Sequence, residues 1–192
     1  MAFATIDVTK GITGTIPVAN GGTGLASGTT GQFLKFTGST TVASSAVDAG
    51  KIAQVIQTIF STDTDFATSS FTDITGGGNT LSATITPSAT NSKVLVTYIT
   101  QANMGNNKGY KTQLERAISG GATTNVLTIP NQKDTYGDGD AHQQRSSVQY
   151  LDSPSTTSAT TYTVMIGTDG AGTVTIADSG SQCMITLMEV LA

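Results

Sequence analysis

Short apolar runs recur along residues 51–192, and polar, glycine-rich segments separate them. The runs are rich in Val, Ile, Thr and Tyr, which favour pleated strands, while the Gly, Asn, Asp and Ser between them favour turns. This spacing predicts about ten short strands in an all-β, antiparallel β-sandwich of the jelly-roll type. The expected strands are Ala53–Phe60, Ser70–Ile74, Leu81–Thr86, Lys93–Ala102, Tyr110–Ser119, Asn125–Ile129, Ser146–Leu151, Thr160–Gly167, Thr173–Ala177 and Cys183–Leu191.

Two of these runs are apolar on both sides, although a half-exposed antiparallel strand is normally polar on one side. One is Val94–Ile99, and the other is the C-terminal run Cys183–Leu191. Either a loop covers the second side or a neighbouring subunit does, and the pattern favours the subunit. The expected interface residues are Met184, Met188 and Val190, and the protein is expected not to be a monomer.

Residues 1–50 carry too little apolar material for a core of their own. Short β-prone pieces (Thr5–Val8, Gly14–Val18 and Gln32–Phe36) alternate with Gly, Ser and Thr. Ordering each backbone residue costs about 1–2 kcal/mol, which so little burial does not offset. The segment is therefore either a flexible arm or an extended arm ordered by packing against other chains, and the spaced apolar residues favour the second. The expected division is an arm at 1–50 and a sandwich head at 51–192.

Composition and charge exclude several classes of function. Charged residues make up 11% of the chain and the net charge is −4, so no basic stripe is present for nucleic acid. No run reaches the roughly 18 apolar residues of a membrane span. The single cysteine, Cys183, excludes an intrachain disulfide and is expected to be an inert core thiol. The first residues lack the pattern of a secretory signal, so synthesis in a cytoplasm is expected.

Candidate catalytic chemistry is sparse. The only histidine, His142, follows a turn-like glycine and aspartate segment, and serines and threonines are so abundant in the chain that those near it do not indicate a catalytic site. Most aspartates, Asp152 among them, lie where turn formation explains them. Asp134, Asp138, Asp140 and His142 offer metal ligands, but their spacing matches no EF-hand, and a solvated loop is favoured. The sequence therefore predicts no enzyme, no cofactor and no metal site.

Several segments together resemble bacteriophage fibre proteins. The first is Ile16–Gly24, a motif of the type PVANGGTG that recurs in tail fibres and other phage fibres. The others resemble a domain common in fibre proteins of marine phages: Ser92–Val96, Leu151–Tyr162 and Ile185–Val190. The resemblance implies a homotrimeric virion component, assembled in the host cytoplasm, whose N-terminal part binds other virion proteins. The expected attachment residues are Ile16, Pro17, Val18, Asn20, Gly21 and Gly22.

The resemblance also implies that the head faces the host and contacts a surface glycan or protein. Loops on a rigid scaffold commonly carry binding, and the expected contact residues are Asn106, Asn107, Lys108, Tyr136, Asp138, Asp140 and His142. The arm is short for a long tail fibre, so a capsid decoration or head fibre with a mainly structural role stays open. A small polysaccharide-degrading enzyme is a third, less favoured alternative.

Overall fold

A computed structural model describes residues 14–16, 22–25, 28–39, 41–45, 51–105, 108–133, 142–170 and 172–191. The chain divides into two units, residues 1–49 and 50–192. The described residues form β-strands, turns and a short 3₁₀ turn, η2 (Asp178–Gly180), without an α-helix. A helix of the length and apolarity needed to cross a membrane is likewise absent from these ranges.

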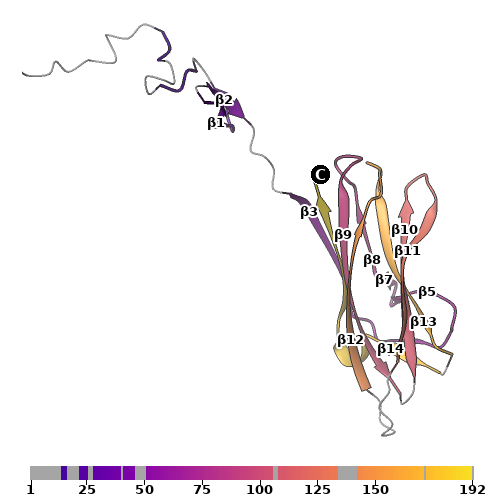
Figure 1. The fold of residues 1–192 in the computed structure, drawn as a ribbon. Helices are drawn as coiled ribbons and strands as arrows, with labels where there is room; N and C mark the ends of the chain where they lie inside the picture. The colour runs from indigo at the N-terminus through magenta and orange to yellow at the C-terminus, as the bar shows by residue number, and fades with distance from the viewer. Residues whose placement is uncertain are drawn as a thin grey trace, which may run out of the picture. The chain divides into compact units, whose positions relative to one another are not determined.

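The second unit is an antiparallel sandwich of two sheets, seen nearly edge-on in Figure 1. The β9 sheet contains β3 (Ile52–Phe60), β4 (Thr64–Phe66), β9 (Lys93–Met104), β12 (His142–Asp152), β14 (Val174–Ile176) and β15 (Cys183–Val190). The β10 sheet contains β5 (Thr72–Asp73), β8 (Ser82–Ile85), β10 (Gly109–Ile118), β11 (Thr123–Lys133) and β13 (Thr160–Thr168). The predicted all-β antiparallel class is therefore confirmed.

Strand β9 organises its sheet. Strand β15 pairs with the first part of one edge of β9, and β14 pairs with the last part. Strand β12 pairs along the whole opposite edge, while β3 lies beyond β15 and β4 lies beyond β14. In the β10 sheet, β10 lies between β11 and β13, and β13 pairs on its other edge with β8 and β5.

The core lies between the two sheets and follows the two-residue period of the strands. Along β9, every second residue from Val94 to Met104 is buried, and along β15 the same holds from Cys183 to Glu189. Two tyrosine–threonine pairs join the sheets across this core. The Tyr98 and Thr112 hydroxyls are 2.9 Å apart, and those of Thr100 and Tyr110 are 3.1 Å apart. Partnered hydroxyls make buried tyrosines and threonines tolerable.

Strand boundaries differ from expectation mainly where polar residues continue a ladder. Strands β11 and β12 are longer than predicted because threonine-, glutamine- and serine-rich ends remain paired with β10 and β9. The predicted run at 70–74 contains only the two-residue β5. A hairpin of β6 (Thr75–Gly76) and β7 (Asn79–Thr80) surrounds Gly77 and Gly78, whose positive φ angles of 59° and 79° suit a tight hairpin turn.

The first unit contains a hairpin that the sequence predicts only in part. Strand β1 (Phe33–Gly38) overlaps the expected piece, but its partner β2 (Thr41–Ser45) was not expected, because its residues are mostly small and polar. Residues 14–16 form no strand, and the expected piece Thr5–Val8 lies outside the described residues. Phe33, Leu34 and Phe36 are exposed. An isolated two-stranded hairpin is marginally stable at best in water, and this one buries none of these three side chains.

Candidate functional site

The outer face of the β9 sheet is built from rows of side chains that cross the strands. Strand pairing aligns Ile59, Met184 and Ile99, followed by Ser147, in a first apolar row. The next level is a polar row of Gln57, Thr186, Thr97 and Gln149. A second apolar row consists of Val55, Met188, Leu95 and Leu151. These three rows are called the banded face.

Much of the banded face lies open. Val55, Ile59 and Leu151 are 54%, 50% and 49% exposed, and the residues of the central strands are half-buried by their neighbours. Within the polar row, the Gln57 side-chain amide donates to the Thr186 hydroxyl at 2.9 Å. Exposed aliphatic side chains in neighbouring rows are typical of a surface that another molecule covers.

The outer face of the β10 sheet has the opposite character. Its aligned residues are Asp73, Met165, Gln113 and Thr128 at one level, Ser82, Thr163, Glu115 and Asn125 at the next, and Thr84, Thr161, Ala117 and Thr123 at the third. Hydrogen bonds link Gln113 to Thr128 at 3.0 Å and Thr84 to Thr161 at 2.8 Å. A face of this polar character suits contact with water.

Toward the β12 N-terminus, the outer face of the β9 sheet becomes polar. The Asp178 carboxylate accepts hydrogen bonds from Asn103 at 2.8 Å and from Gln143 at 3.2 Å. These bonds, that from Asn103 first, lower the pKa of the Asp178 carboxyl. Thr175 donates to Asp65 at 2.6 Å beside them. The sheet therefore has an apolar half and a polar half on one surface.

The predicted interface residues Met184, Met188 and Val190 all point to this outer surface and are half-buried. Whether another subunit covers them stays a prediction. Glu189 shares the opposite, buried side of β15 with Leu187. The two-residue alternation of the strand predicts this placement of Glu189, whereas the apolar residues of the run by themselves do not.

Glu189 is a buried carboxylate without a cation among its described partners. The Ser88 backbone N–H and hydroxyl each donate to Oε1 at 2.6 Å, and the Gln54 amide donates to Oε2 at 2.7 Å. Burial opposes ionisation, but these hydrogen bonds outweigh it and hold the Glu189 pKa at about 2. The Glu189 carboxylate thus links the segment between β8 and β9 to strand β15 by hydrogen bonds.

Asp152 contradicts the turn interpretation given to most aspartates. It is the last residue of β12 and is buried, where Arg116 of β10 donates from Nη1 to its two carboxylate oxygens at 3.0 and 2.8 Å. This ion pair joins the two sheets. No local pattern marks it, because the two residues lie on strands that are far apart in the chain.

The two described contact candidates, Lys108 and His142, both lie near the end of β9. His142 opens β12 and pairs with Met104 at the end of β9. The half-buried Lys108 follows β9 by a turn in which its backbone N–H donates to the Gly105 carbonyl at 3.0 Å. Its side chain also lies against Gly172, between β13 and β14. Asn106, Asn107, Tyr136, Asp138 and Asp140 lie outside the described residues.

The described part of the chain contains no group of three or more His, Cys, Asp and Glu side chains placed to hold a metal ion. Three of the four candidate metal ligands (Asp134, Asp138 and Asp140) fall outside this part. The sequence-based interpretation of that segment as a solvated loop therefore stays a prediction. Cys183 is buried and free, its pKa is raised by burial, and its sulfur accepts a hydrogen bond from the Gln101 N–H at 3.2 Å. A buried thiol of raised pKa is a poor nucleophile.

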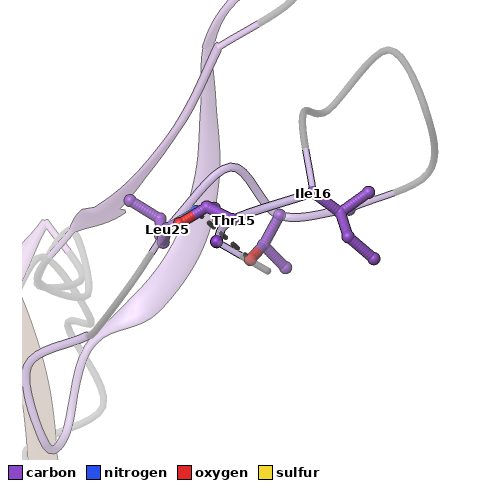
Figure 2. A pocket seen from close by; sticks show the side chains of 6 residues that line it. Thr15, Ile16 and Leu25 are labelled. Atoms are coloured by element: carbon purple, nitrogen blue, oxygen red, sulfur yellow. Dashed lines mark hydrogen bonds between the residues drawn. The ribbon is translucent and has the colours of Figure 1, made fainter. Parts of the chain in front are cut away.

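In the arm motif, Ile16 and Gly22 are the described attachment candidates; Pro17, Val18, Asn20 and Gly21 are outside the described residues. The Gly24 N–H donates to the Ile16 carbonyl at 3.2 Å and closes a loop. A Cβ at Gly22 would collide with that carbonyl, so only glycine fits. Figure 2 shows the pocket beside this closure, lined by Gly14, Thr15, Ile16, Gly22, Thr23 and Leu25.

No protein-family model and no curated protein matches the chain. Partial likeness exists to the structure of infectious bursal disease virus strain Gt (TM-score 0.38, 15% identity), to the VP2 subviral particle of that virus (0.36, 13%) and to its strain Gx (0.34, 12%). Each alignment covers 82% of this chain and 42%, 42% and 40% of the respective matched chain. The chain thus spans about two fifths of the length of the chains it matches. TM-scores below 0.5 at these identities do not establish a shared function.

Proposed function

We propose that this protein is a structural fibre protein of a bacteriophage virion. Its arm attaches it to other virion proteins, and its head assembles as a homotrimer and presents end loops to the host surface. The observation that carries the proposal is the contrast between the two outer faces of the sandwich. One face is polar and internally hydrogen-bonded, whereas the other exposes Val55, Ile59 and Leu151.

Assembly explains two otherwise unpartnered features. The banded face and the exposed Phe33, Leu34 and Phe36 of the β1–β2 hairpin both need covering surfaces. The sequence motif Ile16–Gly24 resembles the attachment region of phage fibres, and Gly22 has no room for a side chain. In a trimer, binding of one end loop to the host surface would raise the effective concentration of the other two near that surface. Three weak contacts would then give a stronger overall attachment.

The role is tested on particles. Gold-labelled antibody against the head, viewed on purified virions by electron microscopy, is expected to mark the tail. Labelling of the capsid would instead support a decoration or head-fibre role, and unlabelled virions would overturn both. In parallel, excess purified protein is expected to slow adsorption of the phage to its host.

The enzymatic alternative has a separate test. Host surface polysaccharide incubated with the purified protein is expected to yield no new reducing ends. Their appearance, abolished by heating the protein, would replace the fibre proposal with a hydrolase.

A further inference from the structure

The two outer faces of one sandwich provide an internal comparison. Met188 on β15 and Met165 on β13 are both half-buried methionines pointing outward from a strand that has neighbours on both sides. Met165 lies between Gln113 and Asp73, whereas Met188 lies between Leu95 and Val55. The surroundings of Met165 are polar and need no partner to cover them. The surroundings of Met188 are apolar and do need one.

The composition of the banded face restricts what can cover it. None of the side chains in its three rows is charged. The nearest cations on its described margins are Lys93, beside Val190, and Arg145, beside Gln101. A charged partner would find no opposite charge on this face to compensate for its lost hydration. An uncharged partner has no hydrated charge to lose. For a chain of net charge −4, a neutral patch is also where two copies approach with least repulsion.

The face is large enough for contact between copies. Strand β9 has 12 residues. At about 3.3 Å per residue and with four strands about 4.8 Å apart, the whole outer surface of the sheet measures about 760 Å², of which the three rows of the banded face take about half. Specific interfaces bury about 600–1,000 Å² per partner, with an apolar centre and a polar margin. The apolar rows and the adjoining polar half have this arrangement.

The order of the rows makes the banded face complementary to the same face of another copy. Apolar, polar and apolar levels alternate every two residues along the strands. If the faces of the copies meet around a common axis with their polar rows at one level, apolar rows meet apolar rows, and the amides of Gln57 and Gln149 offer both donors and acceptors. A shift by one row would bury Gln57 and Thr186 against the level of Met188, where the polar atoms not used in their mutual hydrogen bond would be unpaired.

We propose that the banded face is covered by the same face of further copies of this chain, and that the polar row sets their register. This inference rests on the self-assembly part of the proposed function and specifies its surface. The polar row would act as a single polar layer does in a coiled coil, where it selects one alignment at some cost in stability. Apolar rows supply the attraction, and Gln57 and Thr186 reject shifted pairings.

The first test compares Met188→Lys with Met165→Lys by multi-angle light scattering over a dilution series. Met188→Lys is expected to raise the dissociation constant on the order of a hundredfold, because a lysine ammonium would be buried without a partner. Met165→Lys is expected to leave it unchanged. Val55→Lys gives a second outward-facing variant, and thermal melting of each head confirms folding. Equal behaviour of the folded Met188→Lys and Met165→Lys variants would overturn the proposal.

The second test examines register. Thr97→Cys, in the middle of the polar row, is expected to form an intermolecular disulfide under mild oxidation, whereas Thr163→Cys on the polar face is not. Adding Gln57→Leu and Thr186→Val to the Thr97→Cys variant is expected to keep association but to lower the disulfide yield, because shifted alignments separate the two cysteines. An unchanged disulfide yield in that variant would contradict the register role. An oligomer in which Thr97→Cys alone forms no cross-link would contradict the proposed surface.

These outcomes separate the inference from the wider proposal. A wild-type protein that is monomeric at micromolar concentration defeats the homotrimer itself. An oligomer that survives Met188→Lys defeats only this surface. Virion labelling and adsorption are read independently of both results.

Discussion

The Tyr162 hydroxyl donates to Asp152 Oδ2 at 2.6 Å, the same oxygen that Arg116 contacts at 2.8 Å. Tyr162 extends from β13 and Asp152 ends β12, so the bond connects the two sheets through the core. Burial first, and this hydrogen bond second, raise the Tyr162 pKa well above its ordinary value. The tyrosine therefore stays a donor at physiological pH.

Replacing Asp152 by alanine is expected to destabilise the head by about 3 kcal/mol, because Arg116 and Tyr162 would lose their common acceptor. The measurement is chemical denaturation of the purified head. Asp73→Ala, at an exposed position of β5, is the matched control and is expected to change the free energy of unfolding by less than about 0.5 kcal/mol. Similar losses for both variants would show that the ion pair contributes little.

Glu189 is expected to make stability depend on pH. Its pKa of about 2 in the folded protein lies below the ordinary value of 4.5. The carboxylate therefore contributes stability that is complete above about pH 4.5 and is lost as the pH falls toward 2. Unfolding free energy is measured between pH 2 and 7 for wild type and Glu189→Gln. The variant is expected to be less stable at pH 7 and to show a flatter pH dependence; parallel curves would assign the acid sensitivity elsewhere.

The tyrosine–threonine pairs are expected to show coupling. Tyr98→Phe leaves the buried Thr112 hydroxyl without its partner and is expected to cost about 1–2 kcal/mol. Combining it with Thr112→Val removes both polar groups and is expected to recover part of that loss. A double-mutant cycle by thermal or chemical unfolding measures the interaction, and additive losses would speak against the hydrogen bond as a stabilising contact.

The arm motif is expected to tolerate glycine alone at residue 22. Gly22→Ala forces a collision with the Ile16 carbonyl and is expected to strain the loop by about 1–3 kcal/mol. Gly28→Ala is the control, since a Cβ there meets open space. Both are expected to leave head melting unchanged, but only Gly22→Ala is expected to lower the copies per particle, counted by quantitative immunoblot of purified virions. Equal incorporation would remove this loop from the attachment region.

Much of the sandwich follows from local pattern. Each core strand has a period of two, so the sequence identifies which residues of β9 and β15 share a side. It also locates the glycine turn at Gly77 and Gly78. It does not reveal β2, because Thr41–Ser45 has only one large apolar residue, Val42, and pairs with no strand but β1 among the described residues.

The candidate surface was predictable only in part. Met184, Met188 and Val190 were assigned to one side from alternation. Val55, Leu95 and Leu151 join Met188 only because three strand pairings bring them to the same level. A shift of one residue in any pairing would move a whole strand's outward set to the core, so register cannot be obtained from one strand at a time.

The sequence by itself determined the strand class, the two-sided apolar runs and the glycine-dense arm motif, because backbone sterics and side-chain alternation act over a few residues. Only the tertiary structure decided which side of each strand faces inward, that Asp152 meets Arg116 and Tyr162, and that Glu189 is capped by Ser88 and Gln54. These contacts join residues that are distant along the chain. Their energies depend on burial and on geometry that arise once the sheets have paired and packed.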